Sequence, residues 1–315
     1  MNRKAIIFGI NSYKLKKSEK ILLKQIKPWG IILFSRNIKS IIQLKNLVEE
    51  IKKIFKDKKY PILIDVEGGK ISRLNKIIDL SIFSQNYFEK LYINDKKLFL
   101  NYYEIYINTV SSILKSVGIN INTVPVLDVR RNDAHDIIGT RSFSQYPKNV
   151  SILGNICINF YTQNKIATAM KHIPGHGLSK CDSHYKTPVI KTDKNELIKK
   201  DFKPFKECSS LFAMTGHVIY KMYDSNYTAT HSKVIIDKII RKHIKFKGLL
   251  ISDDISMKSL KFGLEENAIK ALQAGCNLIL HCNGNIKEMY KLAKVIPIID
   301  KFTKKKTSHF YNFLG

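Results

Sequence analysis

The sequence predicts a single-domain (β/α)8 barrel, which belongs to the α/β class. Eight short apolar runs alternate with amphipathic, lysine-rich segments, and this alternation is typical of a parallel sheet built from βαβ units. The length of 315 residues is sufficient, because such a barrel needs roughly 250. No Pro/Gly/Ser-rich linker divides the chain. A doubly wound open sheet is the alternative, but no glycine-rich phosphate-binding fingerprint follows the first apolar run.

The elements follow in order from these patterns. The apolar runs predict strands at 5–10, 30–34, 61–65, 119–126, 166–170, 211–215, 248–252 and 277–281. Helical periodicity predicts helices at 40–55, 98–115, 150–164, 194–207, 232–243, 264–274 and 285–295. We therefore assign residues 1–300 to the barrel domain and 301–315 to a basic C-terminal tail, which can either pack as a last helix or fray.

The net charge of +28 raises the question of a polyanionic partner. The lysines are scattered over predicted solvated helix faces, and no basic stripe with interleaved aromatic residues is visible. We interpret the charge as compositional and predict no specific nucleic-acid partner.

Targeting signals and cysteine usage indicate the compartment. No apolar run approaches the ~18 residues of a membrane span. The apolar hexamer at 5–10 is too short for a signal-peptide core. The five cysteines are odd in number and form no CxxC pair, which favours reduced thiols. We predict a cytoplasmic protein that does not associate with a membrane.

Titratable residues follow five of the predicted strands. In a barrel, the carboxyl ends of all strands meet at one face, where active sites are built. A single Asp at such a position can simply cap the next helix or turn, but capping hardly explains five strand ends at once. The residues concerned are Asp65, Glu67, Asp128, Lys171, His172, His217, Asp253 and Asp254.

The segment 171–188 is the densest in such groups. Pro174 and Gly175 exclude a helix, so we expect a strand that ends at Lys171 and then a polar loop. In Asp182-Ser183-His184 a carboxylate two residues before an imidazole can orient it as a general acid/base. The tripeptide alone, however, favours an ordinary loop histidine with a fortuitous neighbour.

A metal site at the histidines is one further possibility. His172 and His176 have metal-ligand spacing only on a helix, which Pro174 excludes, so we predict no metal site.

The acidic pair lies at the end of a predicted strand. Because adjacent strand residues point to opposite sides, we expect only one of Asp253 and Asp254 to face the mouth. The other would cap the following segment.

Taken together, two stretches resemble signatures of glycoside hydrolase family 3. They are K-H-I-P-G-H-G-x4-D-S-H at 171–184 and S-D-D-I-S-M at 252–257. More narrowly, they resemble the single-domain bacterial β-N-acetylglucosaminidases (β-N-acetylhexosaminidases) of cell-wall recycling. Supporting matches lie at 30–37, 64–73, 125–129, 139–143, 216–220 and 274–280. Val66 and Ile173 depart from the family pattern but are not reactive groups.

The resemblance implies a retaining hydrolase in which the 1–300 barrel is catalytic and no cofactor is needed. It implies Asp253 as nucleophile, His184 as acid/base and Asp182 as the partner that orients His184. The loop 175–185 would close over the substrate. By position, the residues that hold the sugar would be Asp65, Arg73, Arg141, Lys171 and His172.

The implied function is a monomeric exo-β-N-acetylglucosaminidase that releases GlcNAc from GlcNAc-1,6-anhydro-muropeptides, fragments of peptidoglycan. Two alternatives remain open. One is a related exo-hexosidase with a different sugar specificity. The other is a non-catalytic basic binding protein on a decayed barrel. The sequence also leaves open whether water or phosphate is the acceptor.

Overall fold

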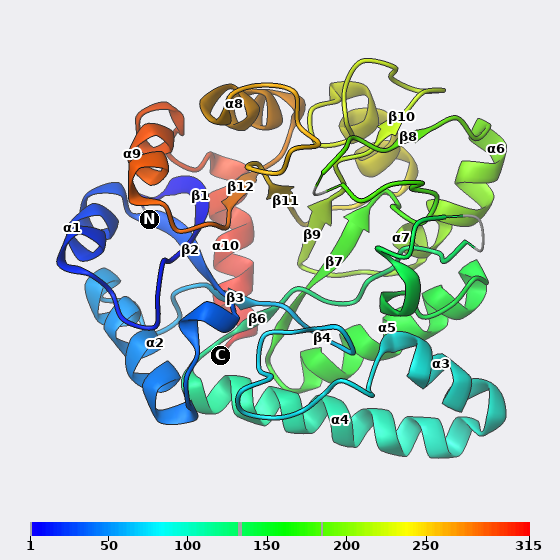
Figure 1. Cartoon of the computed structure of the whole chain (residues 1–315), viewed down its shortest axis with the longest axis horizontal. Coiled ribbons are helices and arrows are strands. Elements are labelled where there is room, and N and C mark those ends of the chain that lie inside the picture. Colours follow the sequence, from blue (N-terminus) through cyan, green and yellow to red (C-terminus); the bar gives the residue numbers. More distant parts are fainter. Residues whose placement is uncertain (1, 132–133, 184) are drawn as a thin grey trace.

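The chain forms a closed barrel of eight parallel strands, as the sequence predicts. The computed structural model describes residues 2–131, 134–183 and 185–315. Around the barrel the strands follow the order β1-β12-β11-β9-β7-β6-β3-β2, and β1 pairs with β2 to close it (Figure 1). Each predicted apolar run overlaps one strand. The bounds are β1 Lys4–Gly9, β2 Pro28–Leu33, β3 Ile62–Ile64, β6 Ile121–Asn122, β7 Ala167–Ile173, β9 Phe212–Thr215, β11 Leu249–Asp254 and β12 Leu278–His281.

Helices surround the strand ring (Figure 1). The α-helices are α1 Lys17–Ile26, α2 Ile41–Phe55, α3 Gln85–Asn94, α4 Lys96–Val117, α5 Pro147–Gln163, α6 Lys194–Glu196, α7 Lys203–Glu207, α8 Leu264–Ala274, α9 Ile286–Val295 and α10 Lys301–Phe313. Short 3-10 helices are η1 Ser35–Asn37 and η2 Gly139–Arg141, and π-helical turns are η3 Leu197–Asp201 and η4 Ile235–His243. Two small two-stranded sheets lie outside the barrel: the antiparallel pair β4 Val66–Gly68 with β5 Ile71–Ser72, and the parallel pair β8 Val189–Ile190 with β10 Ile219–Tyr220. In the described part of the chain, no helix is both long and apolar enough to cross a membrane.

Two helices escaped the sequence prediction, and one predicted helix is divided. The helix α1 has a short apolar face, Leu22, Leu23 and Ile26, which is buried against the barrel. The helix α3 is a separate element that packs on the start of α4. The predicted helix at 194–207 is divided into α6, η3 and α7.

The helix ends follow ordinary capping chemistry. The Asp95 side chain accepts a hydrogen bond of 2.9 Å from the backbone N–H of Leu98 and begins α4. Gly118 ends α4 in the left-handed region, at φ 82°, where glycine costs least. These two caps fix where α4 begins and where the chain leaves it towards β6.

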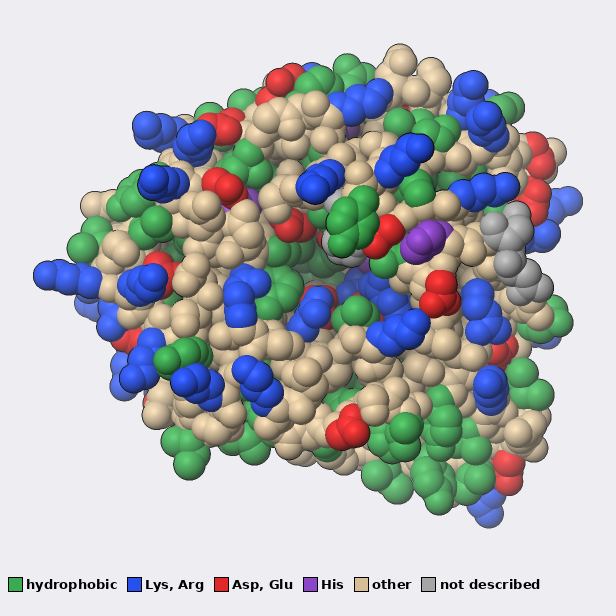
Figure 2. Space-filling model, viewed as in Figure 1, with side chains coloured by type: hydrophobic (Ala, Val, Ile, Leu, Met, Phe, Trp, Pro, Cys, Tyr) green, Lys and Arg blue, Asp and Glu red, His purple; other side chains and the backbone are tan. Residues whose placement is uncertain are grey.

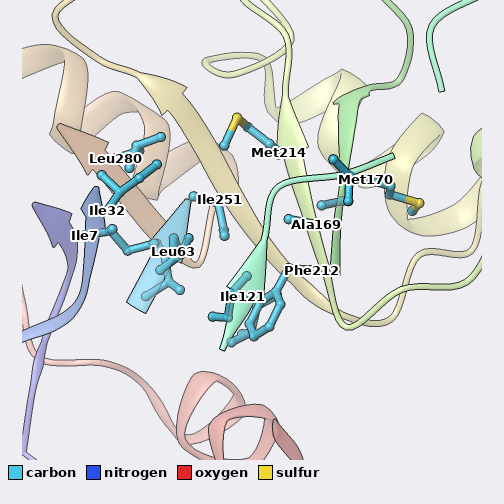
Figure 3. Close-up of a cluster of buried hydrophobic side chains, with 14 of the residues drawn as sticks. Ile7, Ile32, Leu63, Ile121, Ala169, Met170, Phe212, Met214, Ile251 and Leu280 are labelled. Atoms are coloured by element: carbon cyan, nitrogen blue, oxygen red, sulfur yellow. The ribbon is translucent and has the colours of Figure 1, made fainter. Parts of the chain in front are cut away.

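Apolar side chains fill the interior of the barrel (Figure 3). The register pairs Ile32 with Leu63 and Leu63 with Ile121, and on the other side of the barrel it pairs Ile251 with Met214. All five side chains are buried. Because this packed core fixes the strands, the residues at their carboxyl ends are held on a rigid frame.

The helix α10 covers the N-terminal end of the barrel. The Trp29 indole N–H donates a hydrogen bond of 2.8 Å to the hydroxyl of Thr307. The Phe310 ring lies 5.4 Å from Phe212 and 6.4 Å from Trp29, between centroids. Residues 301–313 are therefore a packed helix, seen behind the strands in Figure 1.

The strand β7 extends further than predicted. It continues past Lys171 to Ile173, because Lys171 pairs with Met214 and Ile173 with Thr215 of β9. Lys171 and His172 consequently lie on a barrel strand rather than on a loop.

Candidate active site

A cavity of about 460 Å³ opens at the carboxyl ends of the strands. Figure 2 shows a hollow near the centre of the view, bordered by charged side chains. The cavity brings together six of the predicted site residues, namely Asp65, Arg73, Arg141, Lys171, His172 and Asp253. Of the three residues 182–184, Ser183 lines the cavity, Asp182 is not among the lining residues, and His184 lies outside the described residues.

Lys171 is the buried cation at the base of the cavity. Its Nζ lies 3.0 Å from Asp65 Oδ1, 2.6 Å from Glu67 Oε1 and 3.1 Å from Thr123 Oγ1. Burial alone would lower the pKa of Lys171, but the two carboxylates raise it. The ammonium group is therefore charged and held by three oxygen acceptors.

Asp65 and Glu67 are ionised for the same reason. Burial opposes their charge, yet Lys171 and Arg73 hold the pKa of Asp65 well below its usual range. Arg141 and Lys171 lower the pKa of Glu67 to about 2 against the opposing effect of burial. Both carboxylates are acceptors only, and Asp65 is partly accessible from the cavity.

Arg141 forms a two-pronged ion pair with Glu67. Its Nε and Nη2 lie 2.7 Å and 2.9 Å from the two Glu67 oxygens, and its Nη1 donates to the backbone carbonyl of Ile137 at 3.1 Å. Arg73 makes a looser contact with Asp65 Oδ2, at 3.3 Å from its Nη2. Both arginines line the cavity.

Asp128 orients His172. It is fully buried and lies 2.7 Å from His172 Nδ1, and it accepts the backbone N–H of His176 at 2.7 Å. Burial raises and His172 lowers the pKa of Asp128, with a net lowering. Because an ionised carboxylate only accepts hydrogen bonds, Nδ1 of His172 carries the proton, and this fixes which ring atoms face the cavity.

His176 links the cavity wall to the following loop. Its Nε2 lies 3.1 Å from the hydroxyl of Ser183, and its ring centroid lies 5.5 Å from that of His172. Burial, with a contribution from His172, lowers the pKa of His176 to about 4. His176 is therefore neutral near pH 7 and joins β7 to the loop that ends at Ser183.

Both members of the acidic pair line the cavity, so the prediction that only one faces the mouth was wrong. The cause is a shift in register: Ile251 pairs with Leu278, but Asp254, three residues on, pairs with Leu280, two residues on. The extra residue in β11 breaks the strict alternation of side chains. Asp254 also caps its turn as expected, accepting from the Ser256 backbone N–H at 3.1 Å.

Asp253 is an ionised carboxylate in the cavity. Burial raises the pKa of Asp253. His217, His172, the Asp254 N–H and Lys171 together lower it by more, so the net shift is downward. The Asp254 N–H donates to Asp253 Oδ1 at 2.8 Å. His217 is buried behind the pair, and its Nε2 donates to the backbone carbonyl of Asp254 at 3.0 Å. Asp253 is thus charged, and the backbone N–H of the next residue holds its carboxylate in place.

Glu67, Asp128 and Thr123 complete the site but had no assigned role in the sequence prediction. Glu67 and Asp128 had been noted only as polar residues near strand ends. The signal that could have found them is charge balance, because buried Lys171 and Arg141 require counter-charges. Among the described residues, no group of three or more His, Cys, Asp or Glu is arranged to hold a metal ion.

The arrangement suits chemistry on a polyhydroxylated ligand. Fixed cations and carboxylates offer donors and acceptors to hydroxyl groups, and an ionised carboxylate stands beside them at the mouth of a barrel. Such a fold and site define a carbohydrate-active hydrolase.

Comparison with known proteins agrees with this class. Residues 4–306 match the model of the glycosyl hydrolase family 3 N-terminal domain, and the chain belongs to this family. Its relatives include the "Beta-hexosaminidase" of Psychromonas ingrahamii, 31% identical over 97% of this chain and 88% of that protein. The "Beta-hexosaminidase" of Idiomarina loihiensis is 32% identical over 93% of this chain and 88% of that protein. The chain is a glycoside hydrolase of the β-hexosaminidase type, which confirms the family resemblance.

A solved structure extends the likeness to three dimensions. NagZ from Neisseria gonorrhoeae, in complex with N-trifluoroacetyl-D-glucosamine, has a TM-score of 0.88 and 28% identity, covering 98% of this chain and 90% of that one. The prediction of a single-domain barrel in this family is confirmed.

Proposed function

We propose that the protein is a retaining exo-β-N-acetylglucosaminidase that removes terminal β-linked GlcNAc. The names of its relatives and the glucosamine derivative bound in the Neisseria structure support this sugar. The observation that carries the proposal is the ionised Asp253 facing the same cavity as the Lys171, Asp65 and Arg141 cluster.

The roles follow from the charges. Asp65 accepts hydrogen bonds from sugar hydroxyls, while Lys171, Arg141, Arg73 and His172 donate to hydroxyl and acetamido oxygens. The carboxylate of Asp253 attacks the anomeric carbon, and the bond to the leaving oxygen breaks. A water then attacks the same carbon and releases Asp253, so two inversions give retention.

The acid/base step is assigned to His184, with Asp182 as its orienting partner. His184 gives a proton to the leaving oxygen and then takes one from the attacking water. This assignment rests on the family signature at 171–184. The position of Ser183 at the cavity wall supports it, because it brings the chain to the cavity one residue before His184. Closure of the 175–185 loop over the sugar is part of the proposal.

For the natural substrate we propose GlcNAc-1,6-anhydro-muropeptides, cleaved in the cytoplasm by a monomer. The resemblance to cell-wall-recycling enzymes supports the substrate. The five free cysteines suit a reducing compartment. Light scattering of the purified protein tests the monomeric state, and fractionation of cells tests the cytoplasmic location. Product analysis with purified muropeptides tests the substrate.

The decisive experiment traps the covalent intermediate. A fluorinated N-acetylglucosaminide that slows the second step is incubated with the enzyme, and peptide mass spectrometry locates the added sugar. We expect it on Asp253, and NMR of the wild-type reaction should show the β-anomer first. Asp253→Asn should lose about 10³-fold or more in kcat, since no nucleophile remains.

Asp254→Asn is the matched control, because it neutralises the neighbouring acid of the same cavity. The trap should label position 254 in neither the wild type nor this variant. Label on another residue, or the α-anomer as first product, contradicts the proposal.

His184→Ala tests the acid/base assignment separately. It should slow substrates with a sugar aglycone far more than those with a nitrophenol, which needs little protonation on leaving. An equal loss on both substrates removes His184 from this role.

A further inference from the structure

A second cavity, of about 510 Å³, lies at the opposite end of the barrel from the active site, where β9 and β11 begin. We call it the floor pocket. Three segments form it: α7 with the loop to β9, the turn at 244–248 before β11, and α10. Its basic lining residues are Lys206, Lys245, Lys247, Lys306 and His309.

The positive charge of the floor pocket is not balanced. No Asp or Glu is among its lining residues, and none of the four lysines forms an ion pair with a described residue. The nearest acid of α7, Glu207, is paired with Lys203 at 3.2 Å. Burial and the nearby charge of Lys206 lower the pKa of His243, at the end of η4, so the positive potential extends beyond the lining.

This differs from the usual situation of lysines in this chain. Several exposed lysines on helices have a carboxylate one turn away, such as Lys200 with Glu196 and Lys233 with Asp237. The floor pocket instead gathers cations from three segments that are far apart in the sequence. Lysine abundance alone explains scattered charges, but it does not explain a concave cluster without a counter-ion.

Phosphate groups match this cluster best. A lysine ammonium is a compact point charge that suits phosphate oxygens, and no arginine is present to hold a planar carboxylate in two-pronged fashion. A phosphate monoester carries about −1.5 to −2 at pH 7, so two or three such groups balance four lysines. The phenyl rings of the pocket, Phe205 and Phe246, are buried, so neither offers a stacking platform for a nucleic-acid base.

We propose that the floor pocket binds a small anion with two or three linked phosphate groups. The ligand lies at the N-terminal end of the barrel, at the far end of β11 from Asp253. Binding there is separate from sugar hydrolysis, and the proposal does not depend on the sugar or mechanism assigned above.

Calorimetric titration with inorganic tripolyphosphate, at one fixed salt concentration, tests the proposal on the full chain. The wild type should bind one equivalent. The triple variant K206Q/K247Q/K306Q should bind about tenfold more weakly or worse, because three charged donors are lost. Lys245 is left unchanged since it has φ 63°, in the left-handed region. The variant K206R/K247R/K306R keeps the charge and should retain most of the affinity.

The matched control is K45Q/K90Q/K97Q, which removes the same charge from exposed lysines on α2, α3 and α4. It should bind tripolyphosphate within about twofold of the wild type, as expected for weakly coupled surface charges. All variants should cleave a chromogenic β-N-acetylglucosaminide at the wild-type rate, which also shows that they are folded.

Three outcomes overturn the proposal. The first is that the wild type fails to bind tripolyphosphate. The second is that both glutamine triple variants lose affinity equally, which would mean that binding depends only on the general charge of the protein. The third is that a single-stranded oligonucleotide binds more tightly than tripolyphosphate and loses affinity in the floor-pocket triple, which points to a nucleic-acid surface instead.

Discussion

Glu67 offers a sharp test of the site because two cations depend on it. Glu67→Gln keeps the size and one carbonyl oxygen but removes the charge that faces Arg141 and Lys171. Three close contacts, of 2.7, 2.9 and 2.6 Å, lose their ionic partner. Lys171 retains Asp65, whereas Arg141 is left with the Ile137 carbonyl and a neutral amide.

The loss in the free energy of unfolding that Glu67→Gln should cause can be worked out in two ways. The pKa of Glu67 falls from its ordinary 4.5 to about 2, and at 1.36 kcal/mol per unit this corresponds to about 3 kcal/mol of stability. Removing one partner of a buried ion pair costs about 3–5 kcal/mol in general. We therefore expect Glu67→Gln to lower the free energy of unfolding by about 3 kcal/mol at pH 7.

The pH dependence gives the prediction its sign. The folded-state pKa is lower than the unfolded one, so the contribution is present above about pH 4.5 and is lost as pH falls towards 2. Urea unfolding followed by circular dichroism at pH 7 and at pH 4 measures the difference between wild type and variant. The gap should narrow at the lower pH.

Glu104→Gln, on the exposed face of α4, is the control and should change stability by less than about 0.5 kcal/mol. A loss below about 1 kcal/mol for Glu67→Gln, or a gap that is the same at both pH values, refutes the argument that this carboxylate holds the two cations.

Other residues give further predictions. Asp128→Asn should lower kcat about 10²-fold, measured with a chromogenic substrate, because His172 loses the charged partner that orients its ring; wild-type kcat in the folded variant contradicts this. Phe310→Ala should cost about 3–5 kcal/mol in urea unfolding, since the ring is fully buried under the barrel, and a loss under about 1 kcal/mol would mean that α10 is not packed there. His176→Gln should flatten the fall in wild-type stability as pH drops from 6.5 to about 4, because only the unfolded state takes up that proton. Asp201 has the opposite sign: burial raises its pKa to about 6, so stability falls as pH rises from 3.8 through 6, and Asp201→Asn should remove that fall in the same unfolding series.

The sequence predicts the fold well because each barrel strand is an apolar run. The predicted run 30–34, for example, overlaps β2, Pro28–Leu33, which is buried along its whole length, and such strands appear in a sequence as continuous apolar segments. The short helix α1 was missed, since its buried face holds only three aliphatic residues between lysines. Elements that depend on tertiary pairing, such as the extension of β7 to Ile173, leave no local signal.

The same limit applies to the site. The strand ends place Asp65, Lys171 and Asp253 at the mouth, and barrel geometry alone brings them together. That Asp254 also reaches the cavity depends on a register shift between β11 and β12, which no pattern within 249–254 announces. The partnership of Glu67 with Arg141 joins residues 74 positions apart and emerges only when both are buried.

The position of α10 bears on how the protein is made. Phe310 of α10 covers both Trp29 and Phe212, which come earlier in the chain. A chain growing on the ribosome therefore exposes an indole and a phenyl ring at the N-terminal end of its barrel until α10 has emerged. Arg3, which directly precedes β1, donates a hydrogen bond of 2.8 Å to the hydroxyl of Tyr311 on α10. Synthesis that stops shortly before residue 301 should yield a product with exposed apolar surface, which is prone to aggregation and rapid degradation.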